Sequence, residues 1–394
     1  MKQGNGWKTY CHRGPRPTPS RVPRLSACPS TTTSPRDVKL KAEKTYLPQL
    51  AQSTMHSWSR LQHRRLFGTA RALRHDNPLG LPKNTETPPP QIPRRGGVPE
   101  RRPIAGVKKV VVVASGKGGV GKSTVAVNLA FSLAMRKGLM KPRVGILDLD
   151  IFGPSIPKLM GLDLAPEPNL TSAGALIPLV NHGMPCMSMG FLLPRAEASD
   201  SNADVPVVWR GLMVQKAVQQ LLFQVDWRAD ATGNSSSTDL DVLVVDMPPG
   251  TGDVPLTLGQ LVKVDSAVIV STPQDVALAD VRKGIAMFRK VAVPISGLVL
   301  NQSYFLCPSC TTPHHLFGTP DRFNAVAEQL GVPVLGQLPL LPGVSTSGDR
   351  GAPYALVGDS ALQQGAGEGA LKWKAGMNAV ADRVWDVLYP SSFA

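Results

Sequence analysis

The chain has few cysteines and no long apolar run. Its 394 residues contain five cysteines: Cys11, Cys28, Cys186, Cys307 and Cys310. Such an odd and low number argues against a disulfide framework and favours a reducing compartment. No run of 18 or more apolar residues occurs, so we expect no transmembrane helix. The hydrophobic content of 42% is still sufficient for a core, and Cys186 is expected to be one of its small buried residues.

The larger part of the chain also lacks net charge. The formal charge is +15, but 20 of the 43 Lys and Arg residues and only 5 of the 28 Asp and Glu residues lie in residues 1–102. Residues 103–394 therefore carry 23 charges of each sign. A neutral body argues against a nucleic-acid groove. We expect no nucleic-acid partner.

The basic N-terminal segment is rich in Pro, Arg, Ser and Thr, so it is not expected to build a core. Residues 55–75, MHSWSRLQHRRLFGTARALRH, contain no acidic residue, and on a helix most of their apolar side chains lie opposite arginines. This pattern is typical of a mitochondrial presequence. We predict a disordered extension or gene-model artefact over residues 1–54, with Met55 as the working initiator, then a presequence over 55–80 and a Pro-rich linker over 81–105. A merely disordered basic arm is the alternative.

The predicted main domain, residues 106–390, opens with a phosphate-binding motif. A β-branched run precedes ASGKGGVGKST, and a helical pattern follows it. In this strand–loop–helix context the motif G-x-x-x-x-G-K-[ST] is specific, because glycines and a helix N-terminus offer backbone N–H groups to phosphates. Lys122 is expected to reach the β- and γ-phosphates of ATP, and Ser123 to ligate Mg²⁺. The predicted nucleotide-binding residues of this motif are Gly116, Lys117, Gly118, Gly119, Val120, Gly121, Lys122, Ser123 and Thr124.

Two further strands are predicted to end in carboxylates. Asp148 and Asp150 end the segment RVGILDLD, and Asp246 ends LDVLVVD. Doubly wound sheets bind ligands at the carboxyl ends of their parallel strands. We assign Asp246 to the Mg²⁺ shell, Asp148 to an outer contact with Mg²⁺, and Asp150 to positioning of the attacking water. The turn that follows Asp246, residues 248–250, is expected to sense the γ-phosphate.

Strand-like runs alternate with helical patterns along the rest of the domain. Strands are expected at residues 265–274, 293–302 and 332–340, and helices near 209–227, 276–290, 320–330 and 371–388. This alternation predicts an α/β fold, a P-loop NTPase with a mostly parallel, doubly wound sheet and helices on both faces.

Cys307 and Cys310 form a C-x-x-C pair far from any other cysteine pair. A zinc ion or a [4Fe–4S] cluster normally has four ligands, so one chain supplies half of such a site. His314 and His315 could complete a one-chain zinc site. A redox role for the thiol pair is a further alternative.

The phosphate loop resembles that of the deviant-Walker ATPases, which include MinD, ParA, the nitrogenase iron protein and the arsenite pump. In that class a lysine at the position of Lys117 crosses a dimer interface to the partner's nucleotide. The resemblance implies a homodimer and a catalytic role for Lys117, beside Asp148 and Asp150. It also implies that Asn301, at the end of its strand, contacts adenine.

Five segments are similar, in order and spacing, to the Mrp family of P-loop iron–sulphur carriers, and most of all to its mitochondrial Ind-type, NUBPL-like branch. They are ASGKGGVGKST, DLDIFGPSIPKLMGL, DMPPGTGD, STPQDVALADVRKG and SYFLCPSC, and the resemblance covers about residues 72–390. Gln302 and Thr311 depart from the family pattern, which has Met and Gly there more often.

This second resemblance implies an ATP-binding carrier, at most a weak ATPase, that holds a labile [4Fe–4S] cluster between Cys307 and Cys310 of two subunits. It implies delivery of the cluster to apoproteins of the mitochondrial matrix, respiratory complex I subunits among them. The alternative is a MinD/ParA-like positioning ATPase with a structural zinc or a redox C-x-x-C. The C-terminal segment has too few Lys and Arg to bind lipid, so at most peripheral membrane contact is expected.

Overall fold

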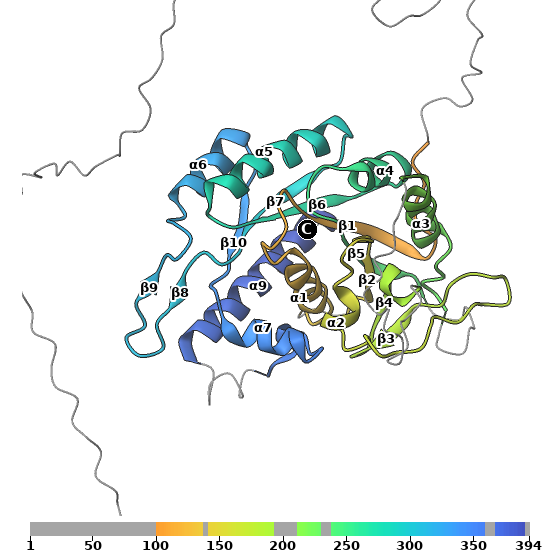
Figure 1. Ribbon diagram of the computed structural model, residues 1–394, viewed down its shortest axis with the longest axis horizontal. Helices are drawn as coiled ribbons and strands as arrows, with labels where there is room; N and C mark the ends of the chain where they lie inside the picture. The colour runs from red at the N-terminus through yellow and green to blue at the C-terminus, as the bar shows by residue number, and fades with distance from the viewer. Residues whose placement is uncertain (1–99, 137–140, 193–210, 230–237, 359–366, 391–394) are drawn as a thin grey trace, which may run out of the picture. The chain divides into compact units, whose positions relative to one another are not determined.

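The computed structural model describes residues 100–136, 141–192, 211–229, 238–358 and 367–390 (Figure 1). The predicted extension and presequence, residues 1–54 and 55–80, lie outside the described residues, as does most of the predicted linker. Its last six residues, 100–105, are described and contact the domain: Arg102 forms a bridge with Val262, and Ile104 is buried.

The described residues contain one eight-stranded sheet with the strand order β10-β7-β6-β1-β5-β2-β4-β3. All neighbouring strands pair in parallel except β3 and β4, which are antiparallel. The strands are β1 (Val107–Ser115), β2 (Val144–Asp148), β3 (Leu179–Asn181), β4 (Met184–Ser188), β5 (Leu240–Asp246), β6 (Ser266–Ser271), β7 (Ile295–Leu300) and β10 (Val334–Gln337).

Helices cover both faces of this sheet. Figure 1 shows α5 and α6 above the strands and α1, α7 and α9 below them. The helices are α1 (Lys122–Ala134), α2 (Ile156–Leu159), α3 (Gly211–Phe223), α4 (Asp253–Leu261), α5 (Asp275–Lys290), α6 (Asp321–Leu330), α7 (Pro342–Asp349) and α9 (Gly367–Leu388), with short 3₁₀ turns at Met189–Phe191 and Tyr354–Leu356. The predicted α/β fold with a mostly parallel, doubly wound sheet is therefore confirmed.

The central strands are continuous apolar runs because both of their faces are covered. In β1 the last six residues are buried, and β1 lies between β5 and β6 in parallel register. Parallel strands in this position carry apolar side chains on both faces. The antiparallel edge, β3 and β4, was not expected as strands, although Cys186 of β4 is buried as predicted.

A separate two-stranded hairpin, β8 (Phe305–Leu306) and β9 (Pro313–His314), follows β7. It projects from the side of the domain, away from the strands of the sheet (Figure 1). It carries both cysteines of the C-x-x-C pair. Among the described residues no helix is long and apolar enough to cross a membrane.

Candidate functional sites

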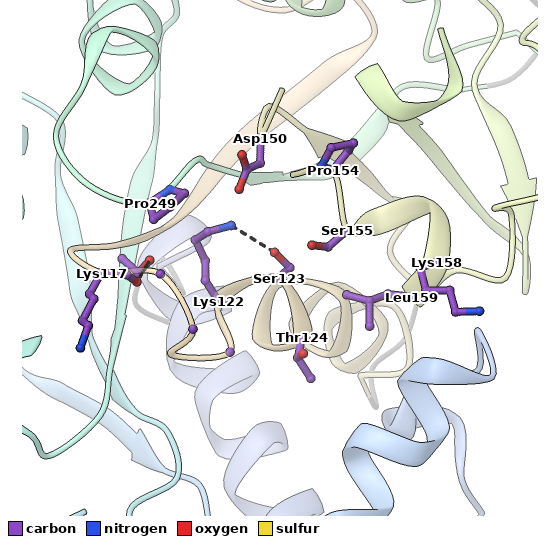
Figure 2. Close-up of a pocket in the computed structure, with 14 residues that line it drawn as sticks. Lys117, Lys122, Ser123, Thr124, Asp150, Pro154, Ser155, Lys158, Leu159 and Pro249 are labelled. Atoms are coloured by element: carbon purple, nitrogen blue, oxygen red, sulfur yellow. Dashed lines mark hydrogen bonds between the residues drawn. The ribbon is translucent and has the colours of Figure 1, made fainter. Parts of the chain in front are cut away.

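The phosphate-loop motif connects β1 to α1 and encloses a pocket. The loop occupies residues 116–121, and Gly121 caps α1 with φ 80° and without a side-chain acceptor. The first N–H groups of α1 therefore have no side-chain partner at the cap, as an anion site requires. The pocket has a volume of about 450 Å³ (Figure 2). Its lining residues are Ser115, Lys117, Gly118, Gly119, Gly121, Lys122, Ser123, Thr124, Asp150, Pro154, Ser155, Lys158, Leu159 and Pro249.

At two positions of the loop a side chain would collide with neighbouring residues of the domain, so glycine is required there by packing. A Cβ at Gly116 would lie 2.5 Å from the backbone carbonyl carbon of Asp280 in α5. A Cβ at Gly121 would lie 2.4 Å from Nδ2 of Asn301. At Gly119, in contrast, a Cβ would meet nothing within 4 Å, and φ is +81°. Gly116 and Gly121 thus allow close packing against α5 and Asn301, and Gly119 provides a backbone conformation that other residues rarely adopt.

Lys122 is buried and paired with Asp246. Its Nζ lies 2.6 Å from Oδ1 of Asp246 and 3.1 Å from Oγ of Ser123. The exposed fractions of the Lys122 and Asp246 side chains are 6% and 0%. Burial raises the pKa of Asp246, and the charge of Lys122 opposes that rise.

The second carboxylate oxygen of Asp246, Oδ2, is buried and has no hydrogen-bond partner among the described residues. A buried acceptor of this kind needs a donor or a cation. Mg²⁺ prefers carboxylate and hydroxyl oxygens and keeps several waters. The carboxylate of Asp246 and the hydroxyl of Ser123 are therefore suitable ligands for a magnesium ion that keeps its water shell.

Asp148 holds the neighbouring loop in place. It is paired with Asp246 in the β2–β5 register and is fully buried. Its Oδ1 accepts from the N–H of Asp150 at 2.9 Å, and its Oδ2 accepts from the N–H of Ile156 at 3.2 Å and from Oγ of Ser188 at 3.1 Å. Burial, followed by the charge of Asp246, raises the pKa of Asp148 to about 7. Because both oxygens are already engaged, Asp148 supports the loop that carries Asp150.

Asp150 is the acidic side chain that lines the pocket itself. Figure 2 shows its carboxyl group pointing toward the end of the Lys122 side chain. Burial raises its pKa, and the charge of Lys122 acts against the rise. Pro249, from the turn after Asp246, lines the same pocket. An acid beside open space and beside this turn is suitably placed to orient a water.

Lys117 lies on the other side of the loop. Its side chain is exposed, and Figure 2 shows it directed away from Lys122 and Asp150. A lysine bound to phosphates of its own subunit would point into the pocket. This orientation leaves the ammonium of Lys117 available to a second molecule.

Asn301 supports the loop from behind. Its side chain is 8% exposed, and Nδ2 donates to the carbonyl oxygen of Val120 at 2.8 Å. The Val120 side chain is buried in the core, so Val120 contributes only its backbone to the surface of the loop. Asn301 also lines a second pocket, of about 170 Å³. The other residues of that pocket are Gly121, Thr124, Val125, Gln302, Pro339, Leu340, Leu341, Val344, Ser345 and Trp373.

The hairpin brings three potential metal ligands together. One ligand atom from each of Cys307, Cys310 and His314 lies within 4.8 Å of the other two. Cys307 is half-buried, and Cys310 is exposed. The turn is closed by the N–H of Thr311 donating to the carbonyl of Cys307 at 2.8 Å. Hydrogen bonds, first from Thr312 and then from Cys307, lower the pKa of Cys310 to about 7, which favours the thiolate.

The two adjacent histidines separate. His315 does not join the cluster: its Nδ1 lies 3.1 Å from the carbonyl oxygen of Ser303. Its ring also stands edge-on to Tyr304, with centroids 6.3 Å apart. Of the pair considered for a one-chain zinc site, only His314 lies at the thiols.

Residues 106–368 match the family model described as ParA: NUBPL iron-transfer P-loop NTPase. The chain belongs to this family. The "Iron-sulfur cluster transfer protein NUBPL" of Mus musculus is 50% identical over 260 residues, which cover 66% of this chain and 74% of that protein. The Arabidopsis thaliana "Iron-sulfur protein required for NADH dehydrogenase, mitochondrial" is 45% identical over 261 residues, covering 66% of this chain and 76% of that protein.

A solved structure has a similar fold. It is the nucleotide-binding protein from Archaeoglobus fulgidus in complex with ADP, which is 33% identical, with a TM-score of 0.50, over 62% of this chain and 87% of that chain. The family match over residues 106–368 includes both the phosphate loop and the hairpin. The two candidate sites therefore belong to one NUBPL-type domain.

Some residues that line the two pockets of this NUBPL-type domain were not predicted from the sequence. Pro154, Ser155, Lys158 and Leu159 line the loop pocket from the start of α2. They lie in DLDIFGPSIPKLMGL, a segment that carries the family resemblance, but they contain no catalytic pattern that would have assigned them to the pocket. Trp373 of α9 lines the second pocket without any local signal, because its position depends on the packing of the last helix.

Proposed function

We propose that this protein is a nucleotide-controlled carrier of iron–sulphur clusters. One observation carries the proposal: a domain of the NUBPL iron-transfer family presents two thiols on a projecting hairpin, Cys307 and Cys310, outside the phosphate loop. Two thiolates are half of the usual ligand set of a [4Fe–4S] cluster. A carrier has to release its cargo, and a half-site on each subunit favours release.

ATP with Mg²⁺ is the proposed nucleotide. Lys122 and the backbone of residues 116–124 would hold the phosphates, while Ser123 and Asp246 would hold the magnesium ion. The second pocket, beside Asn301, would hold the base. The Archaeoglobus relative, described as a complex with ADP, supports a nucleotide in this fold. With Asp150 as the group that orients the attacking water, the activity would be a weak ATPase at most.

The proposed carrier is a homodimer with one shared cluster. The Lys117 side chain is directed away from Lys122 and Asp150 (Figure 2), as that of a residue that contacts the partner's nucleotide would be. A two-fold dimer brings the same surface of both chains together. Cys307 and Cys310 of each subunit then supply four thiolates to one [4Fe–4S] cluster.

The proposed clients are apoproteins of the mitochondrial matrix, with subunits of respiratory complex I among them. The support is the name of the Arabidopsis relative, which refers to NADH dehydrogenase and to mitochondria. The acid-free segment at residues 55–75 agrees with a presequence. Import of a reporter fused to residues 55–80 tests the location, and a cytosolic signal would contradict it.

Anaerobic reconstitution with iron and sulphide tests the carrier function. The expected product is one [4Fe–4S] cluster per two chains, seen in the absorbance near 400 nm, with a dimer mass in solution. The double variant Cys307→Ala and Cys310→Ala should bind no cluster yet keep wild-type ATP affinity. Cluster retained at wild-type stoichiometry in that variant, or tight zinc with no cluster in the wild type, would refute the proposal.

A further inference from the structure

We infer that His314 is a third metal ligand, so that a single subunit holds metal cargo through two thiolates and one imidazole. This inference deepens the proposed function of the same hairpin and rests on it. Each subunit would bind a divalent ion of tetrahedral preference and leave the fourth position open. That open position is where a ligand from a second molecule, partner or acceptor, attaches during transfer.

The distances suit such a site. In a tetrahedral zinc site, bonds of about 2.3 Å to sulphur and 2.0–2.1 Å to nitrogen place the ligand atoms roughly 3.5–3.8 Å apart. The ligand atoms of Cys307, Cys310 and His314 lie within 4.8 Å of one another without any ion. Side-chain rotations that move the ligand atoms by about 1 Å close the difference. Two cysteines and one histidine with an open position are a known ligand set for zinc.

The hairpin itself selects His314. Phe305 pairs with His314, and Leu306 with Pro313, in the antiparallel register. Side chains of paired residues lie on the same face, and successive residues alternate between faces. Cys307, two residues after Phe305, therefore shares a face with His314. Leu306, on the opposite face, is 8% exposed and is turned toward the body of the domain.

The same alternation of side chains excludes His315 from the metal site. It follows His314 directly, so its ring turns to the inner face, where it contacts the carbonyl of Ser303 and the ring of Tyr304. The turn keeps the arrangement in place, since the N–H of Cys307 donates to the carbonyl of Thr312 at 3.1 Å. Two adjacent histidines with different surroundings give a matched pair of variants.

Titration of the nucleotide-free, monomeric protein with Co²⁺ tests the inference. The wild type should bind one Co²⁺ per chain, with the sulphur-to-cobalt charge-transfer band and the visible bands of a tetrahedral ion. His314→Ala should weaken Co²⁺ at least about 10-fold, the loss that even an outer partner of a metal ligand produces, and should change the visible bands. His315→Ala should keep both the affinity and the spectrum of the wild type.

The controls separate the possible failures. X-ray absorption of the zinc-loaded monomer should count two sulphur and one nitrogen ligands, and the nitrogen should vanish in His314→Ala. Wild-type affinity and spectrum in His314→Ala, or Co²⁺ retained by the Cys307→Ala, Cys310→Ala double variant, would overturn the inference. Cluster reconstitution of the dimer is measured separately: its failure with intact Co²⁺ binding refutes the carrier function alone, and the reverse result refutes only the role of His314.

Discussion

The ammonium group of Lys122 lies 2.6 Å from a carboxylate oxygen of Asp246, and both side chains are buried. The lysine expected to bind phosphates is thus paired with the acid at the end of β5. Binding of Mg²⁺ and ATP would supply a new partner to each of them. The buried charge of each side chain is therefore compensated by the other.

Lys122→Ala should weaken ATP binding and also lower the stability of the free protein. A charge-assisted contact to phosphate contributes about 1.5–3 kcal/mol, or roughly 10- to 150-fold in affinity. Removal of one partner from a buried ion pair costs about 3–5 kcal/mol. Calorimetric titration and urea unfolding measure the two effects. Adding Asp246→Asn should restore much of the stability but none of the ATP affinity, and a double variant as unstable as Lys122→Ala would contradict the pairing.

Lys117→Ala should leave ATP binding to the monomer near wild type, because the side chain is directed away from Lys122 and Asp150 (Figure 2). Nucleotide-dependent dimerisation should be lost. Light scattering with and without ATP measures the dimer, and calorimetric titration at low protein concentration measures the affinity. Equal dimerisation of wild type and variant in ATP would show that Lys117 does not cross to the partner.

The stability of the nucleotide-free protein should fall as the pH rises from about 4 to 7. The pKa of Asp148 is raised from 3.8 to about 7 in the folded state, mainly by burial. In that range the folded state keeps a proton that the unfolded state has lost, so raising the pH favours unfolding. The buried Asp246, whose pKa is also raised, acts in the same direction.

Asp148→Asn should flatten this pH dependence, measured as the free energy of unfolding in urea between pH 5 and 8. Asp163→Asn provides the control, because Asp163 is an exposed acid of the same region. An unchanged slope in Asp148→Asn would mean that Asp148 titrates normally in the folded protein.

Nucleotide should alter the rate at which a bound cluster is transferred. Leu340 lines the second pocket, and its N–H donates to the carbonyl of Tyr304 at 2.7 Å. Phe305 forms a bridge with Leu340, and Cys307 follows two residues later. The wall of the proposed base pocket is thus bonded to the start of the hairpin. Coupling between separate sites is typically about 1–3 kcal/mol, or 5- to 150-fold.

Transfer to an apo-acceptor, followed with ATP, with ADP and with no nucleotide, measures this coupling. Asp150→Ala should preserve a difference between ATP and no nucleotide while slowing hydrolysis. Rates that agree in all three conditions, for both proteins, would mean that the loop and the hairpin act independently.

The sequence by itself determined those features that depend on local pattern. The alternation of the main parallel strands with helices followed from apolar periodicity, although β3 and β4 were missed. The G-x-x-x-x-G-K-[ST] motif predicted the loop between β1 and α1. The strand-end acids Asp148 and Asp246 could be predicted to meet, because parallel strands place their carboxyl ends at one edge of the sheet. The C-x-x-C pair was visible from its spacing alone.

Tertiary structure decided what depends on contacts between distant segments. The amide of Asn301 donates to Val120, which lies 181 positions away along the chain, and the orphaned Oδ2 of Asp246 follows from burial that no local pattern reports. Neighbours in sequence were also given different surroundings: His314 faces the thiols, and His315 faces Ser303. From the sequence alone, both histidines were equal candidates for a metal ligand. Only the register of the β8–β9 hairpin, which sets the face of each side chain, distinguishes them.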